Sequence, residues 1–484
     1  MNETVGTLTQ RRKVIVLVSC CLSLLIVSMD ATIVNVAIPA IRTDLSASPS
    51  QMQWVLDVYT LVLASLLMLS GATGDRFGRR RVFQIGLTLF ALGSLACSLA
   101  PTIDALIGAR FLQGIGGSMM NPVVLSIISQ IFVKPQERAR ALGIWGGVTG
   151  ISMAAGPIVG GLLIETVGWR SVFWINLPIC AAALVLTAIF VPETKSATMR
   201  SVDPVGQLLA VVTLFGVVYT LIEGPVLGWT HPRVVGIAVI AVVALAAFLR
   251  FESRREDPFL DLRFFRSIPF SSATISAISA FSAWGAFLFM MSLYLQGERG
   301  FSAMHTGLIY LPIAIGALIF SPLSGRLVGR YGARPSLVIA GTMIVAAATM
   351  LTFLTASTPV WWMLIVFAVF GIGFAMVNAP ITNAAVGGMP LDRAGAASAV
   401  TSTSRQVGVS IGVALCGSVA GSAITLGGTD FATAARPLWF VCVALGFVIL
   451  ALGVYSTSQR AQRSADRLAP LIAGTPSPVG AHVR

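Results

Sequence analysis

The amino-acid sequence predicts an all-helical membrane protein made of two related halves. Hydrophobic residues make up 56% of the 484 residues and charged residues only 11%, whereas soluble domains carry about 25% charged residues. The apolar residues are gathered in runs of about 20, which is the length that crosses a hydrocarbon core of ~30 Å as a helix. Lipid favours helices because they satisfy their own backbone hydrogen bonds. Two short motifs also occur twice, in the same order.

The first repeated motif lies between two apolar runs, as GATGDRFGRRR at residues 71–81 and as GRLVGRYGARP at residues 325–335. The second motif, GIGGSMMN at residues 114–121, returns as GIGFAMVN at residues 371–378. This order predicts two related helical bundles joined in one chain. The distance between the copies is too long for two adjacent six-helix bundles with short loops, so we expect extra helices between them.

Each apolar run predicts one membrane-spanning helix, fourteen in all. The first bundle, residues 13–191, follows a cytoplasmic tail of residues 1–12 and holds helices at 13–40, 51–71, 82–100, 104–130, 141–165 and 171–191. The linker, residues 192–268, adds two inserted helices at 204–224 and 233–251. The second bundle, residues 269–456, holds helices at 269–296, 306–325, 336–356, 361–388, 394–424 and 437–456. The polar segment 457–484, rich in Ser, Pro, Gly and Arg, is expected to be a disordered cytoplasmic tail.

The positive charges predict the orientation, because Lys and Arg collect in cytoplasmic loops. If the N-terminus is inside, both termini and most of the 32 Lys and Arg residues lie on the cytoplasmic side. The formal net charge of +13 then follows from topology and from contact with anionic membrane lipid. We therefore expect no nucleic-acid partner.

Several classes of site are excluded by the remaining residues. The six cysteines lie in apolar runs and the three histidines are isolated, so neither a disulfide framework nor a metal site is expected. None of the three lysines, Lys13, Lys134 and Lys195, follows a glycine. The phosphate-binding pattern GxxxxGK[ST] is therefore absent, and we expect no ATP site, no cofactor and no enzymatic activity.

Four charged residues lie inside predicted helices: Asp30 in the first, Asp57 in the second, Arg110 in the fourth and Arg405 in the thirteenth. A charge at mid-bilayer costs at least ~2.5–3.5 kcal/mol, so each one indicates a functional role. Burial favours the neutral form of a carboxyl group and a nearby arginine favours the charged form, so such a group can load and release a proton. We expect Asp30, Asp57 and Arg110 to take part in proton coupling.

Structural roles are the alternatives. Asp30 could instead hydrogen-bond with Thr32 or Asn35, and Arg110 could fix its helix to neighbouring helices.

Arg405 is followed by Gln406, and we interpret this pair as an intramembrane polar network rather than a ligand site. Glu165 and Glu223 fall at helix ends where water reaches them, which favours an interfacial position over a cation site.

Two further groups of residues have a functional and a packing interpretation. The fifth predicted helix has small residues and a proline, which predict close helix approach and a kink, with or without sliding during transport. In the second bundle, aromatic residues could line a cavity for a flat or cationic compound, or pack in the core. The small residues and proline of the fifth helix are Gly156, Pro157, Gly160 and Gly161. The aromatic residues are Trp284, Tyr294 and Tyr310.

Four motifs in order resemble signatures of the major facilitator superfamily, and of its 14-helix drug:proton antiporter branch. The loop with Gly71, Asp75, Arg76, Gly78, Arg79 and Arg80 is similar to the cytoplasmic loop signature between helices 2 and 3. The run Arg110, Gln113, Gly114, Gly116 is similar to the helix 4 signature, and Gly156, Pro157, Gly160, Gly161 to the helix 5 antiporter signature GPxxGG. The helix 1 signature of this branch is matched by Asp30, Thr32, Asn35 and Pro39.

The resemblance implies roles for these residues. Asp75 would help to latch the two halves on the cytoplasmic side, and Gly329 stands at its position in the second copy, which implies a one-sided latch. Arg110 would belong to the proton-transfer machinery. Positive-inside anchoring is the alternative for the loop.

The sequence and the resemblance together predict a proton-driven exporter that works by alternating access as a monomer in the bacterial cytoplasmic membrane. Its expected partners are protons, membrane lipid and drug-like small molecules of lipophilic or cationic character. An exporter dedicated to one endogenous metabolite or antibiotic shares every motif and remains open. A membrane sensor or scaffold that transports nothing is a more remote alternative, because no soluble signalling domain is evident.

Overall fold

The computed structural model describes residues 9–194, 203–255, 260–386, 394–426 and 431–473, and these residues form helices and no strand. The first half contains α1 (Gln10–Leu45), α2 (Pro49–Phe77), α3 (Arg79–Leu99), α4 (Ile103–Ile131), α5 (Pro135–Thr166), α6 (Ser171–Trp174) and α7 (Asn176–Phe190). The inserted pair is α8 (Pro204–Leu227) and α9 (Pro232–Glu252), followed by the short η2 (Leu262–Arg266).

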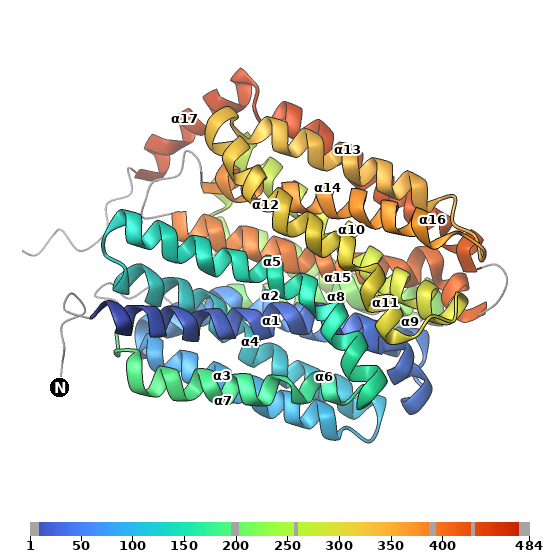
Figure 1. Cartoon of the computed structure of the whole chain (residues 1–484). Helices are drawn as coiled ribbons and strands as arrows, with labels where there is room; N and C mark the ends of the chain where they lie inside the picture. The colour runs from blue at the N-terminus through green and yellow to red at the C-terminus, as the bar shows by residue number, and fades with distance from the viewer. Residues whose placement is uncertain (1–8, 195–202, 256–259, 387–393, 427–430, 474–484) are drawn as a thin grey trace, which may run out of the picture.

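The second half contains α10 (Ile268–Leu293), η3 (Tyr294–Glu298), α11 (Ala303–Ile309), α12 (Leu311–Tyr331), α13 (Ala333–Leu351), α14 (Val360–Val386), α15 (Ala394–Leu426) and α16 (Phe431–Tyr455). The helices of both halves run nearly side by side along the molecule (Figure 1). Each predicted apolar run corresponds to a helix, but the run at 171–191 is divided into α6 and α7, and the run at 306–325 begins with the separate helix α11.

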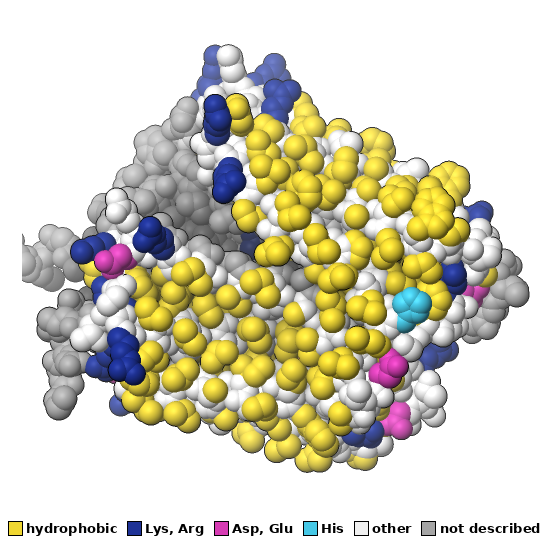
Figure 2. Space-filling model, in the orientation of Figure 1, with side chains coloured by type: hydrophobic (Ala, Val, Ile, Leu, Met, Phe, Trp, Pro, Cys, Tyr) yellow, Lys and Arg dark blue, Asp and Glu magenta, His cyan; other side chains and the backbone are white. Residues whose placement is uncertain are grey.

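The protein is a multi-pass membrane protein. In the described part of the chain, eleven helices are long and apolar enough to cross a membrane, or twelve if the bent helix α2 counts as one span. The number fourteen therefore stays a prediction, although α5 and α15, with 32 and 33 residues, are also long enough to span. Figure 2 shows a broad hydrophobic face across the middle of the molecule.

The two ends of the molecule differ in charge. The basic end is the end where α1 begins at Gln10 and α2 ends at Phe77, and the far end is the end where α1 ends at Leu45. Figure 2 shows Lys and Arg side chains gathered towards the basic end. This is the distribution that the positive-inside rule gives to a membrane protein.

The repeat in the sequence has a structural counterpart. Gly78, between α2 and α3, has φ +111°, and Gly332, between α12 and α13, has φ +76°. Residues with a Cβ rarely adopt such angles, so glycine is required where each helix pair turns. The corresponding glycines of the two motif copies therefore serve the same turn in the two halves.

The halves touch through their far ends. Four hydrogen bonds join residues 13–191 to residues 269–456 in the described part of the chain: Gln53 Nε2 to Val413 O (2.6 Å), Thr60 Oγ1 with Ser410 Oγ (2.6 Å), Gln296 Nε2 to Val36 O (2.9 Å) and Met304 N to Glu165 Oε2 (3.2 Å). Each of them lies at mid-helix or nearer the far end. The structure therefore represents a state that is closed at the far end.

The inserted helices lie on the seam between the halves. Helix α8 packs on both α2 and α15, where Leu61, Val218, Ile222 and Ala414 form a small buried cluster. Helix α9 packs chiefly on α8. Hydrogen bonds fix α8 to each half, from Trp54 Nε1 to Glu223 Oε1 (2.9 Å) and from Ser418 Oγ to Leu221 O (2.6 Å). Glu223 is thus held by the first half.

The prediction of a disordered tail after residue 456 is wrong for Gln459–Ala473, which form the helix α17. Ser458 caps the start of this helix, because its Oγ accepts a hydrogen bond from Ala461 N (3.3 Å). Ala461 and Leu468 are buried, and Ser464 Oγ accepts a hydrogen bond from Ile268 N (2.9 Å). The segment is polar overall but amphipathic, so it folds by docking its apolar side at the start of α10.

Candidate functional site

A buried ion pair occupies the interior of the first half. Asp30 of α1 is 0% exposed and Arg110 of α4 is 1% exposed, and the guanidinium Nη1 of Arg110 donates to Asp30 Oδ2. Arg110 Nε also donates to the Val55 carbonyl oxygen (3.0 Å). Its guanidinium lies over the Tyr59 ring, 4.2 Å from the centroid, which adds a cation–π contact.

Neutral side chains complete the coordination of this pair. Gln113 Nε2 donates to Asp30 Oδ1 (2.8 Å) and to Ser94 Oγ (2.9 Å), while Gln113 Oε1 accepts from Arg110 Nη1 (2.6 Å). Asn176, at the start of α7, donates from Nδ2 to Asp30 Oδ1 (3.2 Å). Both carboxylate oxygens of Asp30 are therefore engaged. The alternative partners Thr32 and Asn35 instead bond to main-chain oxygens of their own helix.

This arrangement holds two opposite charges together in the buried interior of the far-end-closed structure. Two charges out of water are tolerated only with good geometry and satisfied hydrogen bonds, and removing one partner of such a pair costs about 3–5 kcal/mol. The ion pair therefore ties α1 to α4 inside the first half.

Asp57 does not join this network. It is 0% exposed in α2, and neither carboxylate oxygen has a hydrogen-bond partner. Its helix packs on α15, where the Gln53 and Thr60 bonds to the second half lie one turn before and one turn after it. Asp57 is therefore buried in the contact that closes the far end. Burying a carboxyl group without a hydrogen-bond partner is costly, so Asp57 weakens the contact that closes the far end.

The predicted helix 5 motif packs α5 between two partners. Gly156 and Gly160 face Thr32 and Ile33 of α1, where the chains approach too closely for a Cβ. Gly161 faces the Ala303 carbonyl at the start of α11. Gly307 of α11 packs directly against α5, because a Cβ on it would lie 2.5 Å from the Pro157 carbonyl oxygen. The motif thus contributes directly to the contact between the halves.

The loop predicted as a latch is organised within the first half. Asp75 Oδ1 accepts from Arg79 Nε (3.1 Å) and Nη2 (2.7 Å). Glu193, after α7, accepts from the Arg80 main-chain N–H (3.2 Å) and pairs with Arg81 (3.6 Å). A contact of Asp75 with the second half is absent from the described residues, so latching stays a prediction.

The three predicted aromatic residues of the second half all belong to one buried hydrophobic cluster. Trp284 stacks on Phe374 at 4.3 Å, and Tyr310 donates to the Leu288 carbonyl oxygen (3.1 Å) within the same buried cluster. Tyr294 donates to Thr355 O (2.6 Å) near the far end. The three side chains are 4%, 2% and 1% exposed. They pack in the buried core of the second half, and their contact with substrate stays a prediction.

Arg405 of α15 has a different environment from Arg110. Its Nη2 donates to Thr382 Oγ1 of α14 (2.7 Å), and its guanidinium lies 5.8 Å from the Phe281 ring centroid. Its Nε is buried without a hydrogen-bond partner. Arg405 thus joins α15 to α14 through Thr382, and the polar network with Gln406 stays a prediction.

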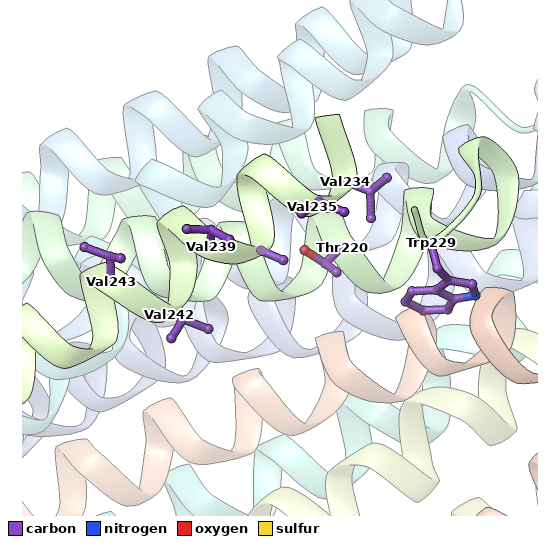
Figure 3. Close-up of a pocket in the computed structure, with 8 residues that line it drawn as sticks. Thr220, Trp229, Val234, Val235, Val239, Val242 and Val243 are labelled. Atoms are coloured by element: carbon purple, nitrogen blue, oxygen red, sulfur yellow. The ribbon is translucent and has the colours of Figure 1, made fainter. Parts of the chain in front are cut away.

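An apolar groove of about 390 Å³ lies between the inserted helices α8 and α9 (Figure 3). Asp30, Arg110 and Arg405 lie in other helices. The lining of the groove includes Thr220 and Trp229, and Thr220 Oγ1 bonds its own helix at Gly216 O (2.8 Å). Valines supply most of the remaining wall. The groove therefore offers no free polar group for proton handling. A group of three or more metal-ligating side chains is also absent from the described residues.

Comparison with known proteins agrees with this architecture. A family model described as the Major Facilitator Superfamily matches residues 20–413. This chain belongs to that family. It is 38% identical to the multidrug resistance protein Stp of Mycobacterium tuberculosis over 84% of this chain and 76% of the relative. It is 34% identical to the methylenomycin A resistance protein of Streptomyces coelicolor over 90% of each chain.

A solved structure of a D-xylose-proton symporter shares the fold, with a TM-score of 0.65, 14% sequence identity and coverage of 90% of this facilitator chain and 97% of the symporter. The resemblance to the superfamily and to its drug-exporting members is thus confirmed.

Proposed function

We propose that this facilitator is a proton-coupled exporter of drug-like small molecules that works by alternating access. The buried pair of Asp30 and Arg110 is the observation that carries the proposal, because it places a carboxyl group and an arginine in contact inside the membrane-spanning region, where charges usually have a functional role. The multidrug and methylenomycin resistance of its relatives, as their names state, supports the direction of transport. The basic end would face the cytoplasm, with both termini there and fourteen spans in all.

The proposed cycle uses the closed far end as one of two states. With the far end closed, Asp30 is ionised, pairs with Arg110, and substrate enters from the cytoplasm. When the halves part at the far end, an external proton neutralises Asp30 and substrate leaves. Return of the halves re-forms the ion pair and releases the proton inward. Asp57, which is buried without a hydrogen-bond partner in the closed contact, would become accessible to an external proton when the far end opens.

The available energy is sufficient for export. Each unit of pH difference supplies about 1.36 kcal/mol per proton, and each 100 mV of membrane potential supplies about 2.3 kcal/mol per charge. One proton moving down one pH unit therefore maintains about a tenfold substrate gradient, because ~1.4 kcal/mol corresponds to a factor of ten.

The test separates the coupling role of Asp30 from its structural role. Everted membrane vesicles are energised with an acid interior, and uptake of a cationic dye, ethidium, and an anionic dye, pyrenebutyrate, is measured with and without an uncoupler. Asp30→Asn leaves Arg110 buried without its counter-charge, so we expect lower thermal stability and loss of uncoupler-sensitive uptake. The double variant Asp30→Asn with Arg110→Gln removes both charges and should regain stability but not coupling.

Two results would contradict the proposal. Full uncoupler-sensitive uptake by the double variant at normal abundance would show that the pair is dispensable for coupling. Wild-type uptake that depends on neither the pH difference nor the membrane potential would show that transport is not coupled to protons.

A dedicated exporter of one antibiotic is the second candidate, because one relative is named for resistance to a single compound, methylenomycin A. Growth inhibition of an expressing strain across a panel of antibiotics distinguishes the two. Protection against one chemical class only would favour the dedicated exporter.

A further inference from the structure

Arg405 is a cation inside the second half for which the described residues provide no acidic partner. Between Ile268 and Tyr455, the described residues contain one acid, Glu298, and it lies at the far end of α10 in η3. Arg405 lies eleven residues after Ala394, about three helical turns from the start of α15 at the basic end. The two groups are therefore separated by a large part of the helix length.

The surroundings of Arg405 leave its charge uncompensated. Its hydrogen bond goes to the neutral hydroxyl of Thr382, and that hydroxyl donates in turn to Asn378 O of its own helix (3.0 Å). Its Nε is buried and unpartnered. Arginines within membrane-spanning segments normally pair with an acid or with main-chain carbonyls, because an unpaired charge is costly there. Arg110 follows that rule and Arg405 does not.

The site is open to an incoming molecule. Thr382 is exposed and Arg405 is half-buried, on adjacent helices α14 and α15. Helix α14 ends and α15 begins at the basic end, and every hydrogen bond between the halves described above lies at mid-helix or nearer the far end. A membrane lipid headgroup would have to reach about three turns into the hydrocarbon region to meet Arg405, which favours a ligand that arrives between the halves.

An aromatic surface adjoins the charge. The Arg405 guanidinium lies over the Phe281 ring, and Phe281 packs edge-on against Phe374 at 5.0 Å. Phe374 stacks on Trp284 at 4.3 Å. A guanidinium presents a planar fork of donors that fits a carboxylate, and the adjacent rings fit an apolar or aromatic body. Phe281 is only 8% exposed, so a ligand held by Arg405 would place its apolar body at the edge of this buried aromatic cluster.

The charges of the interior favour an anion over a cation. Asp30 is already neutralised by Arg110, and Asp57 is 0% exposed in the far-end contact. Neither carboxylate can attract a cationic substrate in this state. The half-buried Arg405 is therefore a charge without an acidic partner among the described residues, and it favours an anionic substrate over the lipophilic or cationic substrates expected from the sequence.

We propose that Arg405, with Thr382, binds the carboxylate of an amphiphilic aromatic substrate whose ring system lies towards Phe281. This proposal rests on the export function above and specifies its substrate class. Arg405 supplies the counter-charge, and a substrate without an acid group loses that attraction.

The experiment uses the purified full-length chain in nanodiscs of zwitterionic lipid and three matched probes: pyrenebutyrate, pyrenebutanol and pyrenebutylamine. They share one ring and one chain, and their end groups are anionic, neutral and cationic. Binding is read from pyrene fluorescence against empty nanodiscs. We expect the wild-type protein to bind the carboxylate at least tenfold more tightly than the alcohol, and the amine most weakly.

Variants assign the preference to Arg405. Arg405→Ala should reduce the affinity for pyrenebutyrate to that for pyrenebutanol and leave the alcohol unchanged, while Arg405→Lys should keep part of the preference. Arg460→Ala, which removes an exposed arginine of α17, is the matched charge control and should change nothing. Thr382→Ala should weaken the carboxylate preference by less than Arg405→Ala does.

Several results would overturn the proposal. Equal binding of the three probes, preference for the amine, or no binding of any probe would each contradict it. Equal loss of acid and alcohol binding in Arg405→Ala would also contradict it, because that result would show a structural role for Arg405. Arg405-dependent displacement of pyrenebutyrate by anionic lipid would assign the site to a headgroup instead. Uncoupler-sensitive ethidium uptake is measured alongside, and if it persists in Arg405→Ala, proton-coupled export stands even where the anion site fails.

Discussion

The contact between α5 and α11 offers a quantitative test of how the far end closes. Gly307 of α11 lies against Pro157 of the helix 5 motif, and a Cβ on Gly307 would sit 2.5 Å from the Pro157 carbonyl oxygen and 3.1 Å from the Ile158 Cα. Ordinary contact for a Cβ begins at 3.4 Å. Gly307→Ala therefore requires α5 and α11 to separate by about 0.9 Å, because the opposing atoms belong to main chain rather than to a flexible side chain.

The expected size of the effect follows from the cost of overpacking. One methyl group forced into a packed contact typically costs 1–3 kcal/mol. That cost applies to the far-end-closed state, where the two helices touch, and not to a state in which the halves have parted there. A difference of about 1–3 kcal/mol shifts the equilibrium between the two states by about 5- to 150-fold towards far-end opening.

Hydrogen–deuterium exchange on the purified protein measures this shift directly. We expect faster exchange in α11 and in the last turns of α5 in Gly307→Ala, with unchanged exchange in α3 and α4, which pack within one half. Gly108→Ala is the matched control, because nothing lies within 4 Å of a Cβ at that position. Uncoupler-sensitive dye uptake should slow in Gly307→Ala and remain normal in Gly108→Ala.

The reasoning would be refuted by a Gly307→Ala protein that exchanges and transports like the wild type. It would also be refuted by exchange that rises equally throughout both halves, since that result would indicate general loosening and not an effect on one gate.

Two further predictions concern buried groups near the halves' contacts and the basic loop. Asp57→Asn places a neutral side chain where the carboxylate has no hydrogen-bond partner, so we expect slower exchange in α15 around Ser410 and slower turnover, whereas faster exchange would contradict this account. Gly78→Ala adds a Cβ at φ +111°, 2.5 Å from Glu193 Oε1, and should lower stability by about 1–3 kcal/mol in thermal unfolding. Gly168→Ala, at φ +102° with nothing within 4 Å, should cost less, and equal losses would exclude the Glu193 contact as a cause.

The sequence predicted the helices well because each one is a long apolar run. It did not predict α17, because its helical order comes from docking at Ile268 and not from an apolar run. The breaks between α6 and α7 and between α11 and α12 were also missed, since both lie inside continuous apolar stretches. Local hydropathy records burial in lipid, but it does not record where a helix turns.

The candidate site was predicted in part. Asp30 and Arg110 were found because a charge inside an apolar run is visible in the sequence, but their pairing joins residues 80 positions apart. Ser94 and Asn176 were missed, since neutral polar residues are common in membrane helices and carry no individual signal. Glu193 was missed because an acid after a helix end usually faces water. Only the fold brings these groups to their charged partners.

The two halves share a fold but differ in their charges. The first half contains a complete ion pair and a second acid, Asp57, at the contact that closes the far end. Inside the second half, Arg405 has no acidic partner among the described residues, and the exposed hydroxyl of Thr382 lies beside it. Alternating access moves one half against the other, so a proton that alters the first half also alters the geometry presented to a substrate bound by the second. With proton groups in one half and the anion site in the other, the contact along α2, α5, α11 and α15 is the element through which the proton and the substrate must influence each other.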